Sequence, residues 1–222
     1  MIDDILIQFN KNSNSDNARA MNAYLKNKFE FFGVKSPLRK ELSKPIFVQV
    51  KNFSREGVIK LVQELWSRPE RELHYLAQEI MFKNLKKKWE EEDIQLIEWL
   101  AVNNSWWDTI DFIAPKLMAD YFLLYPKQIE VFIQKWLNSG NFWLVRCAIL
   151  FQLKYREKTN LELLYKVILE CFDTKEFFVN KSIGWVLREN SKRIPAEIKD
   201  FVQFHNNQLS NLSKREALRL IE

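Results

Sequence analysis

Glycine, proline, cysteine and histidine are all scarce in this chain of 222 residues, which holds 4, 6, 2 and 2 of them. So few glycines and prolines leave little from which to build the tight turns of an all-β fold or a glycine-rich phosphate-binding loop. The 47% hydrophobic and 28% charged residues suit a sizeable core that needs no disulfide or metal staples. We therefore expect an almost entirely helical protein.

The few cysteines and histidines have no spacing that suits a metal site. Cys147 and Cys171 lie in apolar helical patterns typical of buried thiols, and His74 is far in sequence from His205. We therefore expect no metal and no cofactor. Acidic residues near the N-terminus do not fit a signal peptide, and no apolar run has the length of a membrane span. These features predict a cytoplasmic protein without a membrane partner.

Basic and aromatic residues are abundant in the chain. Its 34 Lys and Arg against 29 Asp and Glu give a net charge of +5 and a pI near 9.1. This balance permits a polyanionic partner without demanding one. Aromatic residues make up 14% of the chain and include 8 Trp. Since a helical domain of this size rarely needs so many indoles for packing, we expect some of them to face a groove.

Amphipathic patterns separated by short connections predict a series of helices. Ser36, Ser54 and Ser105 are the expected N-caps of three of them. The expected helices cover residues 2–10, 17–29, 37–44, 54–67, 70–84, 92–103, 105–122, 126–138, 141–156, 160–172, 175–193, 196–205 and 213–221. No linker or shift in composition divides the chain, so we expect a single domain over residues 1–222.

Pairs of aromatic residues open three of the expected helices. They are Trp106–Trp107, Phe142–Trp143 and Phe177–Phe178. The pairs recur about every 35 residues, a period typical of helical-hairpin repeats, although chance pairing in so aromatic a chain is the alternative. Because stacked hairpins place equivalent helices side by side, the repeat predicts a solenoid with one concave wall.

The expected helix 175–193 carries a basic stripe that includes one indole. Its members, at steps of four, three and four, are Lys181, Trp185, Arg188 and Lys192. One helix face with this composition suits a phosphate backbone, and a solvated charged face around a core tryptophan is the alternative. The expected helix 141–156 adds Arg146 and Lys154 on a similar face.

Trp107 and Asp111 lie four residues apart, so an indole and a carboxylate project from neighbouring turns of one helix face. This pair can flank one small group. A core tryptophan beside a surface or capping aspartate is the alternative. The GxSxG, HExxH and phosphate-loop motifs do not occur, and neither histidine is expected near a nucleophile. Spacing alone therefore identifies no enzyme.

Several segments, taken in order, resemble the DNA alkylation repair glycosylase family known as AlkD. They are MNAYLKNKFEFFGVKSPLRK at 21–40, WSRPERELHYLAQEIM at 66–81, SWWDTIDFIAPKL at 105–117, NFWLVRCAILFQLKYREK at 141–158, EFFVNKSIGWVLRENSK at 176–192 and LSKREALRLI at 212–221. The resemblance covers most of the chain. It implies an all-α, right-handed, HEAT-like repeat solenoid with a concave, basic DNA-binding groove.

The resemblance also implies roles for particular residues. Trp107, Asp111 and Trp185 match the family's active-site positions, with Arg146 beside them. The DNA contacts implied by the family, together with Lys181 of the basic stripe, are Tyr24, Lys35, Ser36, Lys40, Lys154, Lys181, Arg188 and Lys192. Two positions depart from the family pattern: Ser36 stands where a threonine is common, and Asn190 where an aromatic residue is common.

The implied reaction is hydrolysis of the N-glycosidic bond of N3- or N7-alkylated purines in duplex DNA. We expect a monomer, because a net charge of +5 suffices to bind DNA without a second subunit. Since alkylation gives the base a positive charge, it leaves as a neutral molecule and needs no general acid. Asp111 would stabilise the cation developing on the sugar and orient water, aided by the faces of Trp107 and Trp185. The alternatives are a DNA-binding relative without activity and a protein-binding scaffold, and the salt dependence of duplex binding separates these two.

Overall fold

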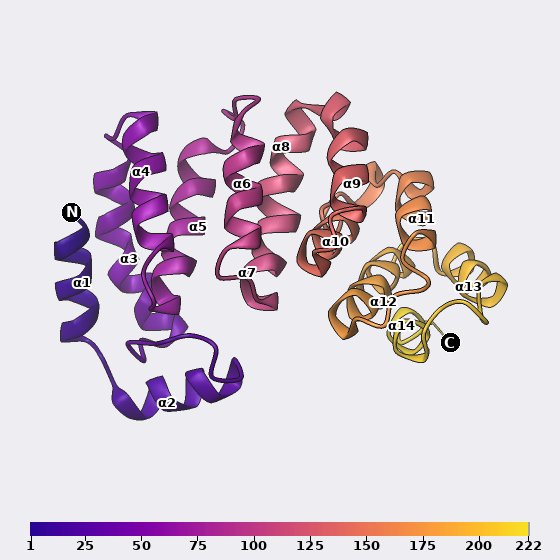
Figure 1. Ribbon diagram of the computed structural model, residues 1–222, viewed down its shortest axis with the longest axis horizontal. Helices are drawn as coiled ribbons and strands as arrows, with labels where there is room; N and C mark the ends of the chain where they lie inside the picture. The colour runs from indigo at the N-terminus through magenta and orange to yellow at the C-terminus, as the bar shows by residue number, and fades with distance from the viewer. Residues whose placement is uncertain (222) are drawn as a thin grey trace. The chain divides into compact units, whose positions relative to one another are not determined.

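The computed structural model describes residues 1–221, and the regular elements in this range are helices. The one pairing of extended backbone is an isolated bridge between Glu30 and Glu70. Figure 1 shows the helices following one another along the chain. The all-α fold expected from the scarcity of glycine and proline is confirmed.

The helices have the following bounds in chain order. They are α1 (Ile2–Lys11), α2 (Ser15–Tyr24), α3 (Ser36–Val50), α4 (Arg55–Trp66), α5 (Arg71–Leu85), α6 (Asp93–Val102), α7 (Trp107–Phe112), the π-helix η1 (Ile113–Met118), α8 (Ala119–Leu124), the 3-10 helix η2 (Pro126–Gln128), α9 (Ile129–Leu137), α10 (Phe142–Leu150), the 3-10 helix η3 (Arg156–Lys158), α11 (Leu161–Leu169), α12 (Phe177–Ser191), α13 (Pro195–Phe204) and α14 (Asn211–Ala217).

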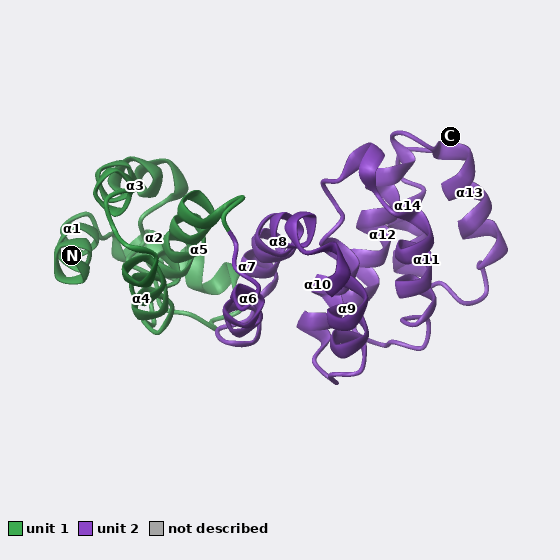
Figure 2. Cartoon of the chain, turned by 90° about the horizontal axis from the view of Figure 1, so that it is seen from above, with its two compact units in different colours: residues 1–88 green, residues 89–222 purple. Residues whose placement is uncertain are grey.

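The chain forms two compact units, Met1–Lys88 and Trp89–Glu222, which Figure 2 draws in different colours. Trp66 is fully buried in the core of the first unit. In the second unit, the Phe122 ring lies 5.8 Å from that of Trp136 and 5.2 Å from that of Phe151. Each unit thus has its own aromatic core. A single domain over the whole chain, and the handedness and concave wall of a HEAT-like solenoid, stay predictions.

Several helix ends differ from the sequence expectation. The helix expected over 17–29 ends at Tyr24, because Lys26 and Asn27 adopt left-handed backbone conformations with φ of 60° and 56°. The helix expected over 37–44 continues to Val50. The one expected over 141–156 ends at Leu150 and is followed by turns.

Of the three expected serine caps, one is confirmed. The Ser54 hydroxyl accepts the N–H of Gly57 at 3.2 Å. Ser36 is the first residue of α3 and not its cap, which is Lys35. Ser105 caps no helix, since its hydroxyl donates back to the carbonyl of Ala101.

A π-helix interrupts the helix that was expected over residues 105–122. Pro115 has no N–H to donate to the carbonyl of Asp111, so the α-helical ladder cannot continue unchanged at this point. Residues Ile113–Met118 instead form wider π turns, and the α-helical pattern resumes at Ala119. The residues that precede the interruption therefore form a short separate helix, α7.

Both cysteines are buried free thiols, as their apolar surroundings predict. Burial raises the pKa of Cys171 to about 12, so this thiol is protonated and unreactive at neutral pH. No helix within residues 1–221 combines the length and apolarity that crossing a bilayer requires.

Candidate active site

Helices α7, α10 and α12 of the second unit line a pocket of about 370 Å³. The lining residues are Trp107, Asp111, Arg146, Phe177, Phe178, Lys181, Trp185 and Arg188. The fold thus brings together all four residues that the sequence singled out for catalysis, although they span 79 positions (185 − 107 + 1) of the chain. It also places two of the expected groove-facing indoles, Trp107 and Trp185, at one site.

The three aromatic pairs stand at the start of α7, α10 and α12, as their repeat predicts. Their rings form one cluster. The ring of Trp106 lies 5.6 Å from Trp143 and 5.2 Å from Phe178, both edge to face. Phe142 stacks on Phe178 with an angle of 7° between the rings. Because such contacts are directional, the cluster fixes how the three helices that line the pocket begin.

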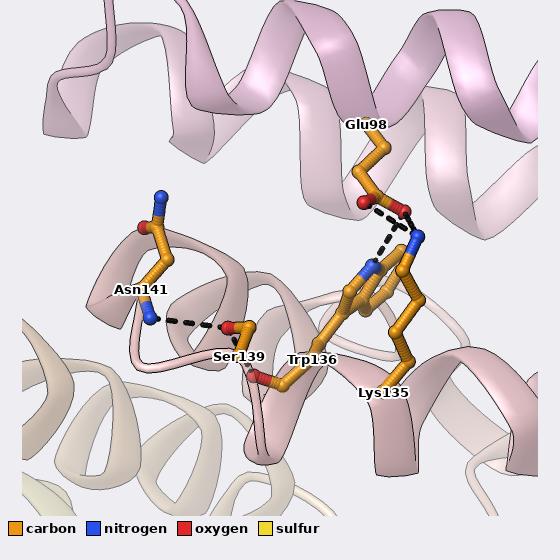
Figure 3. Close-up of polar contacts among 5 residues, drawn as sticks. All are labelled: Glu98, Lys135, Trp136, Ser139 and Asn141. Atoms are coloured by element: carbon orange, nitrogen blue, oxygen red, sulfur yellow. Dashed lines mark hydrogen bonds and ion pairs between the residues drawn. The ribbon is translucent and has the colours of Figure 1, made fainter.

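A chain of polar contacts holds the loop that leads into α10 (Figure 3). Glu98 of α6 accepts hydrogen bonds from Lys135 Nζ at 2.8 Å and from Trp136 Nε1 at 3.1 Å. The Trp136 carbonyl accepts from the Ser139 hydroxyl at 2.7 Å. The backbone N–H of Asn141 donates to the same hydroxyl at 3.1 Å, and the Asn141 side chain caps α10. The contacts connect α6 and α9 to the start of the helix that carries Arg146.

Asp111 is the carboxylate among the lining residues, and Arg146 holds one side of it. Arg146 Nε and Nη2 donate to the same oxygen, Oδ1, at 3.0 Å and 2.7 Å. Among residues 1–221, the side-chain hydrogen bonds to Asp111 both end on Oδ1, and none ends on Oδ2. The Arg146 side chain is 4% exposed and that of Asp111 is 21% exposed. The pair therefore leaves one carboxylate oxygen for a ligand in the pocket.

Burial controls the acidity of Asp111. Removal from water raises the pKa of this carboxyl above its ordinary value, and the charge and hydrogen bonds of Arg146 oppose that rise. The charge of Asp108 adds to the rise. Arg146 is therefore the main group that favours the ionised form of Asp111.

Arg146 also connects α10 to α12. Its Nη1 donates to the backbone carbonyl of Phe178, so one guanidinium bonds to residues of two other helices. Arg146 is 3% exposed, and Lys154 lies in the turns after α10. The expectation that Arg146 and Lys154 share one basic helix face is therefore wrong. Arg146 is a buried support for the pocket.

The two cations of α12 that line the pocket share one carboxylate. Lys181 Nζ donates to Glu216 Oε1 at 2.6 Å, and Arg188 Nη1 donates to Glu216 Oε2. The hydrogen bond from Lys181 is the main cause that lowers the pKa of Glu216, and Arg188 adds to it. Sequence reasoning expected these cations to contact phosphates and did not foresee Glu216. The one trace of it in the sequence is an acidic residue in the basic stretch 214–219.

Lys192, the last member of the expected stripe, and Lys154 lie outside the residues that line the pocket. Both approach Glu189, at 2.6 Å for Lys192 and 4.0 Å for Lys154. Both lysine side chains are more than half exposed. Exposed ion pairs of this kind are weak, so a phosphate can compete for either lysine.

The remaining predicted DNA contacts lie in the first unit. Lys35, Ser36 and Lys40 gather in the first turns of α3, and all three are exposed. Tyr24 ends α2 and is 70% exposed. These positions are accessible to a ligand, as a DNA contact requires.

A buried carboxylate shapes the loop that leads into α3. Glu72 accepts backbone hydrogen bonds at 2.9 to 3.2 Å from Phe32, Gly33 and Val34. Gly33 has a φ of 84°, and a Cβ there would lie 2.0 Å from the carbonyl oxygen of Asn14. Only glycine fits this position. Glu72 therefore sets the path of the chain into Lys35, a role that sequence reasoning missed.

The histidines take part in local contacts. His74 is fully buried, with Nδ1 3.0 Å from Arg71 Nη1 and Nε2 2.8 Å from the Arg68 carbonyl. His205 Nδ1 lies 2.7 Å from Gln208 Oε1. In the described part of the chain, no cluster of three or more His, Cys, Asp or Glu side chains could hold a metal ion.

Comparisons with known proteins cover the elements that build this pocket. A family model described as DNA alkylation repair enzyme matches residues 5–221. A solved structure described as a predicted DNA alkylation repair enzyme from Enterococcus faecalis is similar, with a TM-score of 0.85 and 29% sequence identity. The alignment covers 94% of this chain and 96% of that one. Among curated proteins, none matches.

Proposed function

Since the chain belongs to the family of DNA alkylation repair enzymes, we propose that it is a DNA glycosylase that releases N3- or N7-alkylated purines from duplex DNA. The observation that carries the proposal is Asp111. Arg146 holds one of its carboxylate oxygens, the other accepts no hydrogen bond from residues 1–221, and Asp111 lines a pocket with aromatic side chains. We further propose that the chain acts as a monomer and needs no cofactor, because one chain supplies every group the reaction uses. We also propose that it is cytoplasmic.

The proposed reaction needs little from the protein. The bond between the sugar C1′ and the base nitrogen breaks, and its electron pair moves to the base and cancels the charge that alkylation placed there. Water adds to C1′ and loses a proton, which leaves an abasic site and a neutral base. Because the leaving group requires no proton, a single carboxylate suffices.

Asp111 supplies that carboxylate. Its open oxygen can face the positive charge that develops on the deoxyribose and can accept a hydrogen bond from the attacking water. The half-buried setting strengthens this attraction, since less water screens the charges. Arg146 favours the ionised form of Asp111 and fixes its direction, so the carboxylate need not reorganise during the reaction.

Trp107 and Trp185 line the same pocket from α7 and α12. The face of an indole carries partial negative charge and attracts cations. Two such faces around the sugar would stabilise the same charge as Asp111. In this proposal Lys35, Ser36, Lys40 and Tyr24 of the first unit contact the DNA backbone, as do Lys154 and Lys192 of the second.

The experiment that tests the proposal measures free base released from methylated duplex DNA by the purified protein, with a chelator present and no cofactor added. We expect the wild-type protein to release base. Asp111→Asn keeps the shape of the side chain and loses its charge, so we expect release to fall by about a hundredfold or more. Duplex binding should change by less than about twofold, since Asp111 contacts no phosphate in this account.

Two outcomes would contradict the proposal. If Asp111→Asn lost base release and duplex binding in equal measure, the carboxylate would not have the assigned role. If the wild-type protein released no base but bound duplex in a strongly salt-dependent way, the chain would be a DNA-binding relative without glycosylase activity. Binding that did not respond to salt would favour a protein-binding scaffold.

A further inference from the structure

Helix α14 approaches α12 closely at the residue that separates the two cations of the pocket. This residue is Gly184, three positions after Lys181 and four before Arg188. A Cβ at position 184 would lie 2.5 Å from the Cβ of Glu216 and 2.9 Å from the Ser213 carbonyl oxygen. Any larger residue would push α14 away, so glycine permits Glu216 to sit directly over this face of α12.

A second contact fixes α14 at that place. The Ser213 hydroxyl donates to the backbone carbonyl of Asn180 on α12 at 2.8 Å. Ser210 caps α14 by accepting the backbone N–H of Ser213 at 3.0 Å. Figures 1 and 2 both show α14 beside α12. The Glu216 carboxylate is therefore presented to α12 from a fixed position, and it is only 9% exposed.

Glu216 accepts only a few of the hydrogen bonds that the Lys181 and Arg188 side chains can donate. An ammonium has three N–H groups and a guanidinium has five. Lys181 and Arg188 each give one donor atom to Glu216, and no other acceptor among residues 1–221 binds their side chains. Both side chains line the pocket beside Trp185. Two cations and one carboxylate leave a net charge of +1, which one phosphodiester would neutralise.

We propose that Glu216 is a positioning residue, which holds Lys181 and Arg188 side by side as a prearranged site for one DNA phosphate next to the damaged nucleotide. The inference rests on the proposed function, because the phosphate belongs to the DNA whose base is released. Without the carboxylate, the two cations repel each other and their long side chains take other rotamers. The site would then hold more charge but bind a phosphate less well.

Glu189 provides a matched control. It lies on α12 and, like Glu216, pairs with two cations, here Lys154 and Lys192. Replacing Glu216 or Glu189 by Gln adds the same single positive charge to the protein. Glu189 and its lysines do not line the pocket. The experiment measures the affinity of each variant for an undamaged duplex over a range of salt concentrations, together with single-turnover base release at saturating protein.

We expect the two substitutions to change the affinity for duplex DNA in opposite directions. Glu189→Gln should bind duplex more tightly than wild type, because freed lysines gain phosphate contacts, and should release base at the wild-type rate. Glu216→Gln should bind at least about threefold more weakly despite its added charge, and should release base roughly tenfold more slowly. A general effect of charge cannot produce opposite changes in binding.

Tighter binding by Glu216→Gln, to the extent seen for Glu189→Gln, would overturn the inference whatever happens to base release. The binding comparison decides the matter even if the wild-type protein releases no base, a result that would refute the proposed function alone. If Glu216→Gln failed to fold by circular dichroism, Glu216→Asp would replace it. This variant keeps the charge but has a shorter reach, so weaker binding supports the inference and unchanged binding contradicts it.

Discussion

On the α7 side of the pocket a carboxylate keeps one oxygen open, whereas on the α14 side a carboxylate has both oxygens bound. Asp111 receives two hydrogen bonds on a single oxygen, and its pKa is raised by burial. Glu216 receives one cation on each oxygen, and its pKa is lowered by them. Both carboxylates pair with basic side chains, so pairing alone does not distinguish them. The carboxylate oxygen that accepts no hydrogen bond is what makes Asp111, and not Glu216, the candidate for chemistry.

The largest effect on this comparison is expected when Arg146, which supports Asp111, is replaced. Arg146→Gln leaves a half-buried carboxylate without its cation, so we expect the free energy of unfolding to fall by about 3 kcal/mol. Base release should drop by about a hundredfold, because Asp111 loses both its orientation and the cation that favours its ionised form. Denaturant unfolding and single-turnover release measure the two effects.

Asp111→Asn is the control for that stability loss. Because the pKa of Asp111 is raised in the folded state, its ionised form is held less well than in the unfolded chain. Its contribution to stability is therefore present at low pH and is lost as the pH rises through the folded pKa. Asp111→Asn leaves the buried Arg146 without its carboxylate, but it also removes a charge that burial disfavours, so we expect the unfolding free energy to fall by less than in Arg146→Gln. A loss of stability as large as that of Arg146→Gln would show that the pair, and not Arg146, supports the fold.

The dependence of base release on pH tests whether burial controls the acidity of Asp111. In the proposed mechanism release requires ionised Asp111, so the rate should fall as the pH drops, with a midpoint above 3.8, the ordinary value for aspartate. The pKa of Glu216 is shifted the opposite way, below its ordinary value, because Lys181 and Arg188 bind its oxygens. Rates of the wild-type protein, corrected for release by Asp111→Asn, measure the midpoint. A midpoint at or below 3.8 would mean that the burial of Asp111 does not control its acidity.

The aromatic side of the pocket should contribute less than the carboxylate. Trp185→Ala removes one indole face, and we expect base release to slow by about tenfold, since a cation beside an indole gains about 0.5 to 2 kcal/mol. Trp185→Phe should recover much of that loss. Trp99→Ala is a matched control, because Trp99 lies on α6 at the surface and does not line the pocket. An equal loss in the Trp99 variant would indicate a general effect on folding.

The smallest effects are expected at the lysines outside the pocket. Lys192→Gln removes one exposed cation, so the slope of log affinity against log salt should decrease by about 0.9, as for the loss of one phosphate contact. Affinity should fall by only a fewfold, and single-turnover release at saturating protein should not change. Titration of a labelled duplex at several salt concentrations gives the slope. A large fall in the release rate would place Lys192 in the reaction itself.

Local patterns predicted the parts of the fold that depend on neighbours in sequence. The pairs Trp106–Trp107, Phe142–Trp143 and Phe177–Phe178 marked the starts of three helices that line one pocket, because a repeat places equivalent positions side by side. The four-residue spacing of Trp107 and Asp111 likewise holds within α7. Such predictions succeed because the relevant contacts repeat at a regular interval.

The sequence did not predict contacts between helices at positions that do not repeat along the chain. Nothing in the spacing of Lys181 and Arg188 indicates that Glu216, 28 residues beyond the second of them, takes one donor from each. Pro115 did carry a signal for the break after α7, since a proline inside a helix removes one hydrogen bond of the ladder. The form of the break, a π-helix and not a kink, depends on packing around it.

The measurement that tests the central claim most directly is a double-mutant cycle on Asp111 and Arg146. Single-turnover release would be compared for Asp111→Asn, Arg146→Gln and the variant that carries both changes. If Arg146 acts through Asp111, the double variant should be no slower than Asp111→Asn alone, and its unfolding free energy should exceed that of Arg146→Gln. Losses that multiply would contradict the account, because each residue would then act on the substrate independently.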